Sequence, residues 1–349
     1  MPFRDVVGHL RLIKLLSRSA AGATLPPSLL FAGPSGVGKR LTAVALAQAL
    51  NCQAPITNQS AAAGPLADDA LPLDACGRCA ACTRIARGVH PDVVIVEPGD
   101  SGAIKIDQVR DVVDRAMYRP FEGRRRVVII DQADALVAAA QNALLKTLEE
   151  PPSSSVFILV TSRPDVLLPT VRSRCPDLRF RPLAATDIAT VLVARKHSES
   201  EARAVAATAD GSVGQALQAS AGELVEARDI AQRVLAAAAS ARDAGSRLEG
   251  AKELLPKSGG RPGFERDYLA TNLRAMASLL RDAEVLATEA DAAALANADA
   301  DVRPALEKLA KGYGGERGVR AFGAIDEALV ALDRNAGVKI VADWLVLQL

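Results

Sequence analysis

The segment GPSGVGKR, residues 33–40, departs at one position from a pattern that binds phosphate. In the pattern G-x-x-x-x-G-K-[ST], backbone N–H groups surround the phosphates, the lysine reaches the terminal phosphates, and the hydroxyl ligates magnesium. Gly33, Gly38 and Lys39 satisfy the pattern, but Arg40 stands where the hydroxyl belongs and cannot ligate a cation. The chain is therefore either an NTPase that tolerates this change or the descendant of one with another task.

An acidic residue follows a later apolar run. The segment RVVIID ends on Asp131, at the position of the carboxylate that holds magnesium in P-loop NTPases. The next residue, Gln132, is an amide where a glutamate would activate water, and an amide cannot accept the proton. Taken alone, Asp131 is equally well explained as the end of a strand that caps the next helix.

Four cysteines have spacings typical of a metal site. Cys76, Cys79 and Cys82 form C-x2-C-x2-C, and Cys52 ends the preceding predicted helix. Four thiolates can close a tetrahedral structural zinc site with no open position for catalysis. Four unrelated reduced thiols are one alternative, which the double spacing disfavours. An iron–sulfur cluster is the other, and it is disfavoured because the apolar shell and further spacing signals of such clusters are missing. Cys52 is the expected fourth ligand, with His90 as the other candidate.

An arginine-rich segment, VRSRCPDLRF, follows at residues 171–180. An exposed arginine such as Arg174 could reach into the nucleotide site of a neighbouring subunit. From the residues alone, a solvated surface arginine explains Arg174 better.

Composition limits the classes of partner. The 349 residues are 49% hydrophobic and 24% charged, as in ordinary soluble proteins, and the net charge is +1. Whole-chain charge is thus excluded as a reason to bind nucleic acid or anionic membranes. No apolar stretch approaches the roughly 18 residues of a membrane span, and the start lacks a signal peptide, which together predict a cytoplasmic protein.

The apolar pattern predicts three parts. Short runs rich in β-branched residues indicate buried parallel strands, with helical patterns between them, in an α/β P-loop domain over residues 1–181. These runs are LLFAG (29–33), DVVIVE (92–97), RVVIID (126–131) and SVFILVTS (155–162). A small helical domain at 182–222 and a larger helical domain at 223–349 follow. Residues 53–75 have no period and predict a mobile surface loop.

Four segments together closely resemble one family. GPSGVGKR, the cysteine cluster, NALLKTLEEPP (142–152) and RSRC (172–175) look like the corresponding segments of bacterial DNA polymerase III clamp-loader subunits, which are AAA+ proteins. The combination of ALLKTLEEPP with SRC is the most specific part. The resemblance extends from DVVGH near the start to LDRNAGVKIVADWLVLQL at the end, and so covers nearly the whole chain.

The resemblance implies a fold and a set of site residues. It implies an AAA+ P-loop domain with a parallel sheet and a zinc-binding module at 52–82, a small helical lid domain, and an all-helical collar domain that joins subunits. A nucleotide site, degenerate here, would be formed by Gly33, Gly36, Gly38, Lys39 and Asp131. Arg174 matches the arginine that serves a neighbour's ATP site.

Three departures from the family indicate the group within it. Arg40, Gln132 and Gly214 stand where the ATPase subunits have a hydroxyl, a glutamate and an arginine, whereas Arg174 is kept. This is the pattern of the delta-prime group. The resemblance therefore implies a stator without intrinsic ATPase activity that belongs to the DNA polymerase holoenzyme. The alternative within the family is an active clamp-loader ATPase.

The resemblance also implies partners and cofactors. Tau/gamma ATPase subunits and a delta subunit would complete a hetero-pentameric ring, which meets the sliding clamp and primed DNA as a complex. Structural Zn²⁺ is implied, and ATP binding is left doubtful by Arg40. A zinc-dependent nucleic-acid-binding module acting outside the ring is the remaining rival, and the near-neutral charge argues against it.

Overall fold

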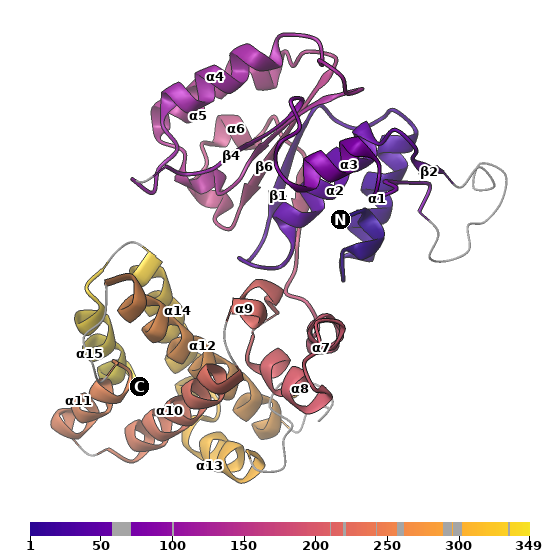
Figure 1. The fold of residues 1–349 in the computed structure, drawn as a ribbon. Helices are drawn as coiled ribbons and strands as arrows, with labels where there is room; N and C mark the ends of the chain where they lie inside the picture. The colour runs from indigo at the N-terminus through magenta and orange to yellow at the C-terminus, as the bar shows by residue number, and fades with distance from the viewer. Residues whose placement is uncertain are drawn as a thin grey trace. The chain divides into compact units, whose positions relative to one another are not determined.

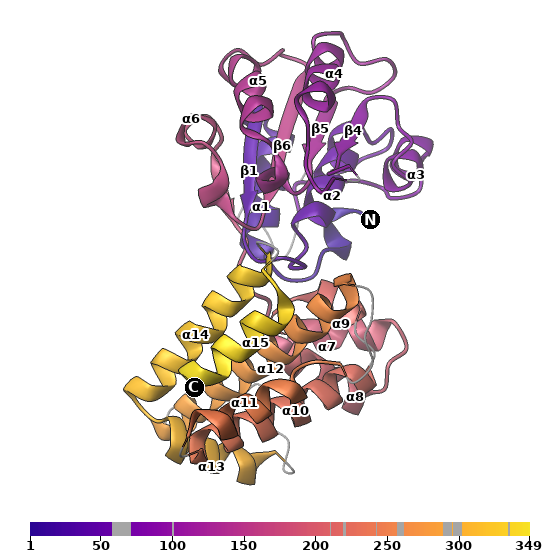
Figure 2. The ribbon, with the colours of Figure 1, turned by 90° about the vertical axis from the view of Figure 1, so that its left-hand side faces the viewer.

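The chain forms two compact units, Met1–Leu183 and Ala184–Leu349, drawn in Figures 1 and 2. The computed structural model describes residues 1–57, 71–99, 101–209, 211–218, 221–241, 243–256, 262–288, 295, 302–333 and 336–349. The predicted division of the second unit at residue 222 stays a prediction.

A five-stranded parallel sheet lies at the centre of the first unit, in the order β4-β5-β6-β1-β7 (Figure 2). The strands are β1 (Ser28–Ala32), β4 (Val93–Val96), β5 (Arg126–Ile130), β6 (Ser155–Thr161) and β7 (Asp177–Arg179). The apolar runs predicted as strands are confirmed as β1, β4, β5 and β6, whereas the short β7 was not predicted. Because all five run parallel, their carboxyl ends meet at one edge of the sheet.

Helices cover both faces of this sheet (Figure 1). One face packs against α1 (Leu10–Ala21), α2 (Lys39–Asn51) and α3 (Ala80–Ala86), and the other against α4 (Ile106–Ala116), α5 (Ala138–Glu149) and α6 (Pro169–Arg172). Successive residues of a strand point into the apolar cores on opposite faces of the sheet. In β1, Phe31 packs in the core with α2, and Leu30 packs in the core with α5. Short 3-10 helices lie at Phe3–Asp5, Ala133–Ala135 and Pro164–Val166.

The segment predicted as a surface loop has paired ends. Strands β2 (Ile56–Thr57) and β3 (Leu73–Asp74) form an antiparallel pair, and residues 58–70 of the predicted loop lie outside the described residues. The buried carboxylate of Asp74 accepts the Phe3 N–H at 2.8 Å and pairs with Arg4 at 2.9 Å. The chain start therefore fixes β3, a long-range contact that leaves no periodic signal in the sequence.

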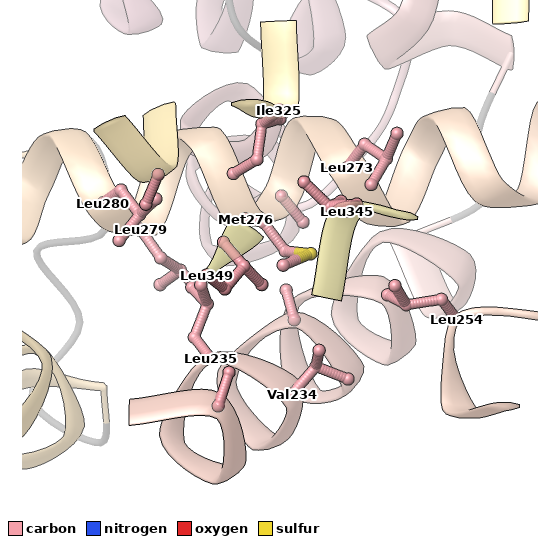
Figure 3. Close-up of a cluster of buried hydrophobic side chains, with 14 of the residues drawn as sticks. Val234, Leu235, Leu254, Leu273, Met276, Leu279, Leu280, Ile325, Leu345 and Leu349 are labelled. Carbon is pink, nitrogen blue, oxygen red and sulfur yellow. The ribbon is translucent and has the colours of Figure 1, made fainter. Parts of the chain in front are cut away.

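The second unit is helical. Its helices are α7 (Ala185–Ala194), α8 (Glu199–Thr208), α9 (Val213–Gln218), α10 (Ala221–Ser240), α11 (Ala244–Glu253), α12 (Pro262–Ala287), α13 (Arg303–Tyr313), α14 (Glu316–Asp333) and α15 (Val338–Gln348). Helix α12 packs against α10, α13 and α14. Figure 3 shows leucine, valine and isoleucine side chains gathered around Met276 of α12, among them Leu235, Ile325 and Leu345, all fully buried. Among the described residues, none of the helices combines the length and apolarity needed to span a bilayer.

One buried carboxylate fixes the turn between α4 and β5. Asp92 is fully buried and accepts the N–H groups of Phe121, Glu122 and Gly123 at 2.7–2.9 Å. It also pairs with Arg126 at 2.9 Å. Burial alone would raise the pKa of Asp92, but these backbone donors and the guanidinium lower that pKa to about 2.

We expect Asp92 to make the first unit sensitive to acid. The unfolded carboxyl has a pKa of about 3.9, so the stabilisation is complete above that pH and is lost as the pH falls towards 2. Asp92→Asn should lower the free energy of unfolding by about 3 kcal/mol at pH 7 and flatten this pH dependence. Urea unfolding followed by far-UV circular dichroism measures both effects.

The single tryptophan, Trp344, lies in the second unit and gives an internal control, because its fluorescence transition should not move. Asp107→Asn, at an exposed carboxylate, is the matched substitution. Equal acid sensitivity of the wild type and Asp92→Asn would show that another group titrates.

Candidate functional site

The GPSGVGKR loop connects β1 to α2 at the carboxyl edge of the sheet. Gly33, Gly36 and Gly38 have φ values of 150°, 74° and 99°, which L side chains rarely adopt. A Cβ on Gly33 would lie 2.2 Å from the carbonyl oxygen of Phe180. Glycine at this position is therefore required for the loop to pass the end of β7.

Lys39 is turned onto its own loop. Its Nζ donates to the carbonyl of Gly33 at 2.6 Å and to that of Pro34, and only 7% of the residue is exposed. Burial lowers the pKa of Lys39 to about 8, although the charges of Asp131 and Asp134 act to raise it. Two of the three ammonium N–H donors are thus used within the loop itself.

Arg40 lies between two carboxylates at the ends of neighbouring strands. Its Nη1 is 2.5 Å from Glu97 Oε1, just after β4, and 3.3 Å from Asp131 Oδ2, just after β5. Burial raises the pKa of Asp131, and the charge of Arg40 opposes that rise. A permanent cation therefore stands beside the carboxylate that the phosphate-loop pattern assigns to magnesium.

The polar residue at the end of β6 is also engaged within the chain. The Thr161 hydroxyl donates to Asp134 Oδ1 at 2.8 Å, and Arg163 pairs with Asp134 Oδ2 at 3.2 Å. Asp134 was not singled out from the sequence. Only its place three residues after Asp131 could have indicated it. Gln132, two residues after the end of β5, adopts a left-handed φ of 52°.

Arg174 follows α6, and its side chain is 33% exposed. One guanidinium nitrogen pairs with Glu149, at the end of α5, and another donates to the carbonyl of Thr170 at 2.8 Å. Gly214 lies on α9 in the second unit. The structure thus brings Lys39 and Asp131 together at the sheet edge. The polar partners of Arg174 are Glu149 and the carbonyl of Thr170.

The four cysteines meet in one cluster. The Sγ atoms of Cys52, Cys76, Cys79 and Cys82 all lie within 4.8 Å of one another, and those of Cys52 and Cys79 are 3.9 Å apart. A tetrahedron with Zn–S bonds of about 2.3 Å has S–S edges of roughly 3.8 Å, so this spacing suits a metal ion. The cluster could therefore bind a metal through four thiolates.

Backbone amides support this chemistry. The N–H of Cys76 donates to Cys52 Sγ at 3.2 Å, and the N–H of Cys79 donates to Cys76 Sγ at 3.3 Å. Burial acts to raise the pKa of Cys79, but backbone donors from Cys82 and Gln53 help to lower it to about 6. Donors of this kind stabilise the thiolate that a metal requires.

His90, the other candidate ligand, is engaged elsewhere. Its Nδ1 accepts the N–H of Asp92 at 3.1 Å, which leaves the ring proton on Nε2, 3.3 Å from Glu122 Oε1. The side chain is buried in this network. Cys52, and not His90, joins the other three cysteines.

Comparison with known proteins gives the family. The protein family described as "DNA polymerase III, delta subunit" matches residues 8–184. A DNA polymerase III subunit delta' from Pseudomonas aeruginosa is 43% identical over 144 residues, which are 41% of this chain and 39% of that protein. A DNA polymerase III subunit gamma/tau from Mycobacterium tuberculosis is 36% identical over 179 residues, 51% of this chain and 28% of that protein. The matched region thus spans two-fifths or less of these relatives.

Solved structures give weaker likenesses. A gamma subunit-related protein of Thermotoga maritima matches with a TM-score of 0.40 and 16% identity, over 97% of this chain and 98% of that one. The Bacillus subtilis clamp loader delta protein matches with a TM-score of 0.35 and 11% identity, over 95% and 98%. The assignment comes instead from the family match, which covers half of the sequence. The chain belongs to the DNA polymerase III clamp-loader family.

Proposed function

We propose that this chain is a non-hydrolysing clamp-loader subunit of the delta-prime type. In this proposal it lends Arg174 to the ATP site of a neighbouring tau/gamma subunit, within a five-membered ring that also contains delta. The ring loads the sliding clamp on primed DNA. The observation that carries the proposal is the position of Arg40 between Asp131 and Glu97.

Arg40 opposes magnesium binding in two ways. It removes the hydroxyl ligand of the pattern, and its charge would repel a divalent cation at Asp131. Magnesium prefers oxygen ligands in near-ideal octahedral geometry, which a guanidinium at 3.3 Å from Asp131 does not allow. The residues present therefore do not fit the ion that nucleotide hydrolysis requires.

The remaining parts of the site support the same conclusion. Lys39 donates to the loop carbonyls of Gly33 and Pro34, and Thr161 donates to Asp134. Gln132 has no basic group with which to activate water. A nucleotide would have to displace these contacts without the help of magnesium.

Arg174 has the chemistry of an arginine offered to a partner. A partly exposed guanidinium held by the surface carboxylate Glu149 can exchange that partner for phosphate oxygens, which bind arginine more strongly in a dry interface. Surface ion pairs of this kind contribute about 1 kcal/mol or less. Breaking the ion pair between Arg174 and Glu149 to make this exchange therefore costs little free energy.

Two neighbouring helices of the second unit present apolar side chains to solvent. Val319 and Phe322 of α14, and Ile340, Trp344 and Leu347 of α15, are between 37% and 74% exposed. The α15 residues recur at helical spacing on one face, and α14 packs against α15. Such a surface supports the proposal that this unit is a collar that contacts neighbouring subunits.

The cysteine cluster is proposed to hold one structural Zn²⁺. Four cysteine ligands leave no open coordination position, and zinc with this ligand set stabilises the local fold. The ion would then have no part in chemistry on a substrate.

Substitution of Arg174 tests the main proposal. In the loader reconstituted with clamp and primed DNA, Arg174→Ala should lower ATP turnover, because an arginine supplied in trans accelerates hydrolysis at its site on the order of 1,000-fold. Lys39→Ala should leave turnover unchanged. Arg172→Ala, at an exposed arginine two residues away, is the control for assembly. A loss of turnover in Lys39→Ala would instead favour an active ATPase.

Restoring the missing hydroxyl should restore magnesium-dependent nucleotide binding. Arg40→Thr removes the cation beside Asp131 and supplies the ligand of the pattern. We expect titration calorimetry to detect magnesium-dependent ATP binding by the Arg40→Thr variant. The wild type should show no such binding. Arg40→Ala, which removes the cation without adding the hydroxyl, separates the two effects. Magnesium-dependent binding by the wild type would contradict the proposal.

Metal content tests the cysteine cluster. The wild type should contain about one zinc ion per chain by elemental analysis. Cys52→Ser should lose the ion, whereas His90→Ala should keep it, because His90 lies in a separate network. Chelation should loosen residues 50–57 and 71–90 and leave strand β6 and the helices of the second unit folded. Cooperative unfolding of the whole chain on chelation would contradict this local role.

A further inference from the structure

A loop far from the nucleotide position combines an exposed tip with a fixed base. We call residues 117–125, between α4 and β5, the aromatic loop, because Tyr118 and Phe121 are 71% and 83% exposed. Its backbone is nevertheless held by the buried Asp92, which accepts three of its N–H groups. The aromatic loop thus has an exposed tip on a backbone that buried groups hold in place.

A second anchor of the aromatic loop comes from the residue next to Cys52. Asn51 is the last residue of α2 and is 3% exposed. Its Oδ1 accepts the N–H groups of Arg124 at 2.9 Å and Arg125 at 3.0 Å. A Cβ on Gly123 would lie only 2.6 Å from this oxygen, so the loop and the end of α2 are in close contact.

A third anchor comes from α3, which carries two of the cysteines. Cys79 is the N-cap of α3 and Cys82 lies in its first turn. Two residues later, Arg84 pairs with Glu122 of the aromatic loop at 2.8 Å, and His90 approaches the same carboxylate oxygen at 3.3 Å. Both helices that hold the loop are therefore also the helices that meet at the cysteine cluster.

Apart from the cysteines, α2 and α3 are joined by apolar packing, with Ile85 of α3 in the same core as Leu46 of α2, and by one hydrogen bond. Gln48 of α2 donates to the carbonyl of Cys82 at 2.7 Å. Sulfur contacts such as the 3.9 Å approach of Cys52 to Cys79 are weak hydrogen bonds at best. Four coordinate bonds to one ion would join the two helices far more strongly.

We propose that metal binding by the four cysteines holds the aromatic loop in shape, with Asn51 and Arg84 as the positioning residues that transmit the constraint. The inference rests on the proposed metal binding and gives the bound metal a second structural role. The metal would tie α2 to α3 at the cysteine site. The surface whose shape depends on this tie is the exposed tip of the aromatic loop, with Tyr118 and Phe121.

Hydrogen exchange of the full chain, with zinc bound and after chelation, tests this coupling. Chelation should make the amides of Arg124 and Arg125 exchange about tenfold faster, the effect of losing roughly one hydrogen bond. Strand β6 and helix α12 should keep their protection. With zinc bound, Asn51→Ala should cause the same change in the loop without loss of zinc.

Two variants make the test specific. Asn51→Asp keeps an acceptor oxygen at the same position and should retain the protection of the loop. Asn272→Ala removes a buried asparagine of the second unit, where Nδ2 donates to the Leu254 carbonyl, and should leave the loop unchanged.

The outcomes separate the coupling from the metal site itself. Zinc binding without any change in loop exchange on chelation would overturn the coupling alone. Loss of protection throughout Met1–Leu183 would overturn it too, because the effect would not be specific to the loop. A wild type that binds no zinc would refute the metal site and the coupling together.

Discussion

The carboxylate of Asp131 is buried at the sheet edge, where a neighbouring cation stabilises its negative charge. Burial raises its pKa, and a positive charge must offset the cost of removing the carboxylate from water. In a phosphate-binding NTPase this charge is a magnesium ion delivered with the nucleotide. Here the guanidinium of Arg40 supplies it from the adjacent helix, at 3.3 Å, and Glu97 balances the added charge. The negative charge of Asp131 at this edge is therefore balanced by a side chain of the same chain.

The same edge explains why the phosphate-loop pattern survives in the sequence. Gly33 must pass within van der Waals range of the Phe180 carbonyl, and Gly38 adopts a left-handed φ immediately before α2. These constraints come from the turn between β1 and α2, and they hold whether or not a phosphate is present. The glycines of the pattern are thus required by the fold, whereas the identity of residue 40 concerns the chemistry of the site.

Much of the fold could be predicted because it depends on local periodicity. The four longest strands, the loop that follows β1 and the cysteine cluster all arise from short segments whose residue types are informative. The three-residue strand β7 and the two-residue strands β2 and β3 were missed, since runs this short carry no period. The choice of Cys52 over His90 needed the tertiary structure, which gives His90 other partners.

The partners of Arg40, Asp92 and Asn51 could not have been predicted from one sequence. Each joins segments that are far apart in the chain, as Asn51 does with Arg124 and Arg125. A buried polar side chain shows only that a partner must exist, and folding decides which one it is.

The contacts of Lys39 have a broader consequence. By donating to the carbonyls of both Gly33 and Pro34, the ammonium group acts as an internal brace for the turn between β1 and α2.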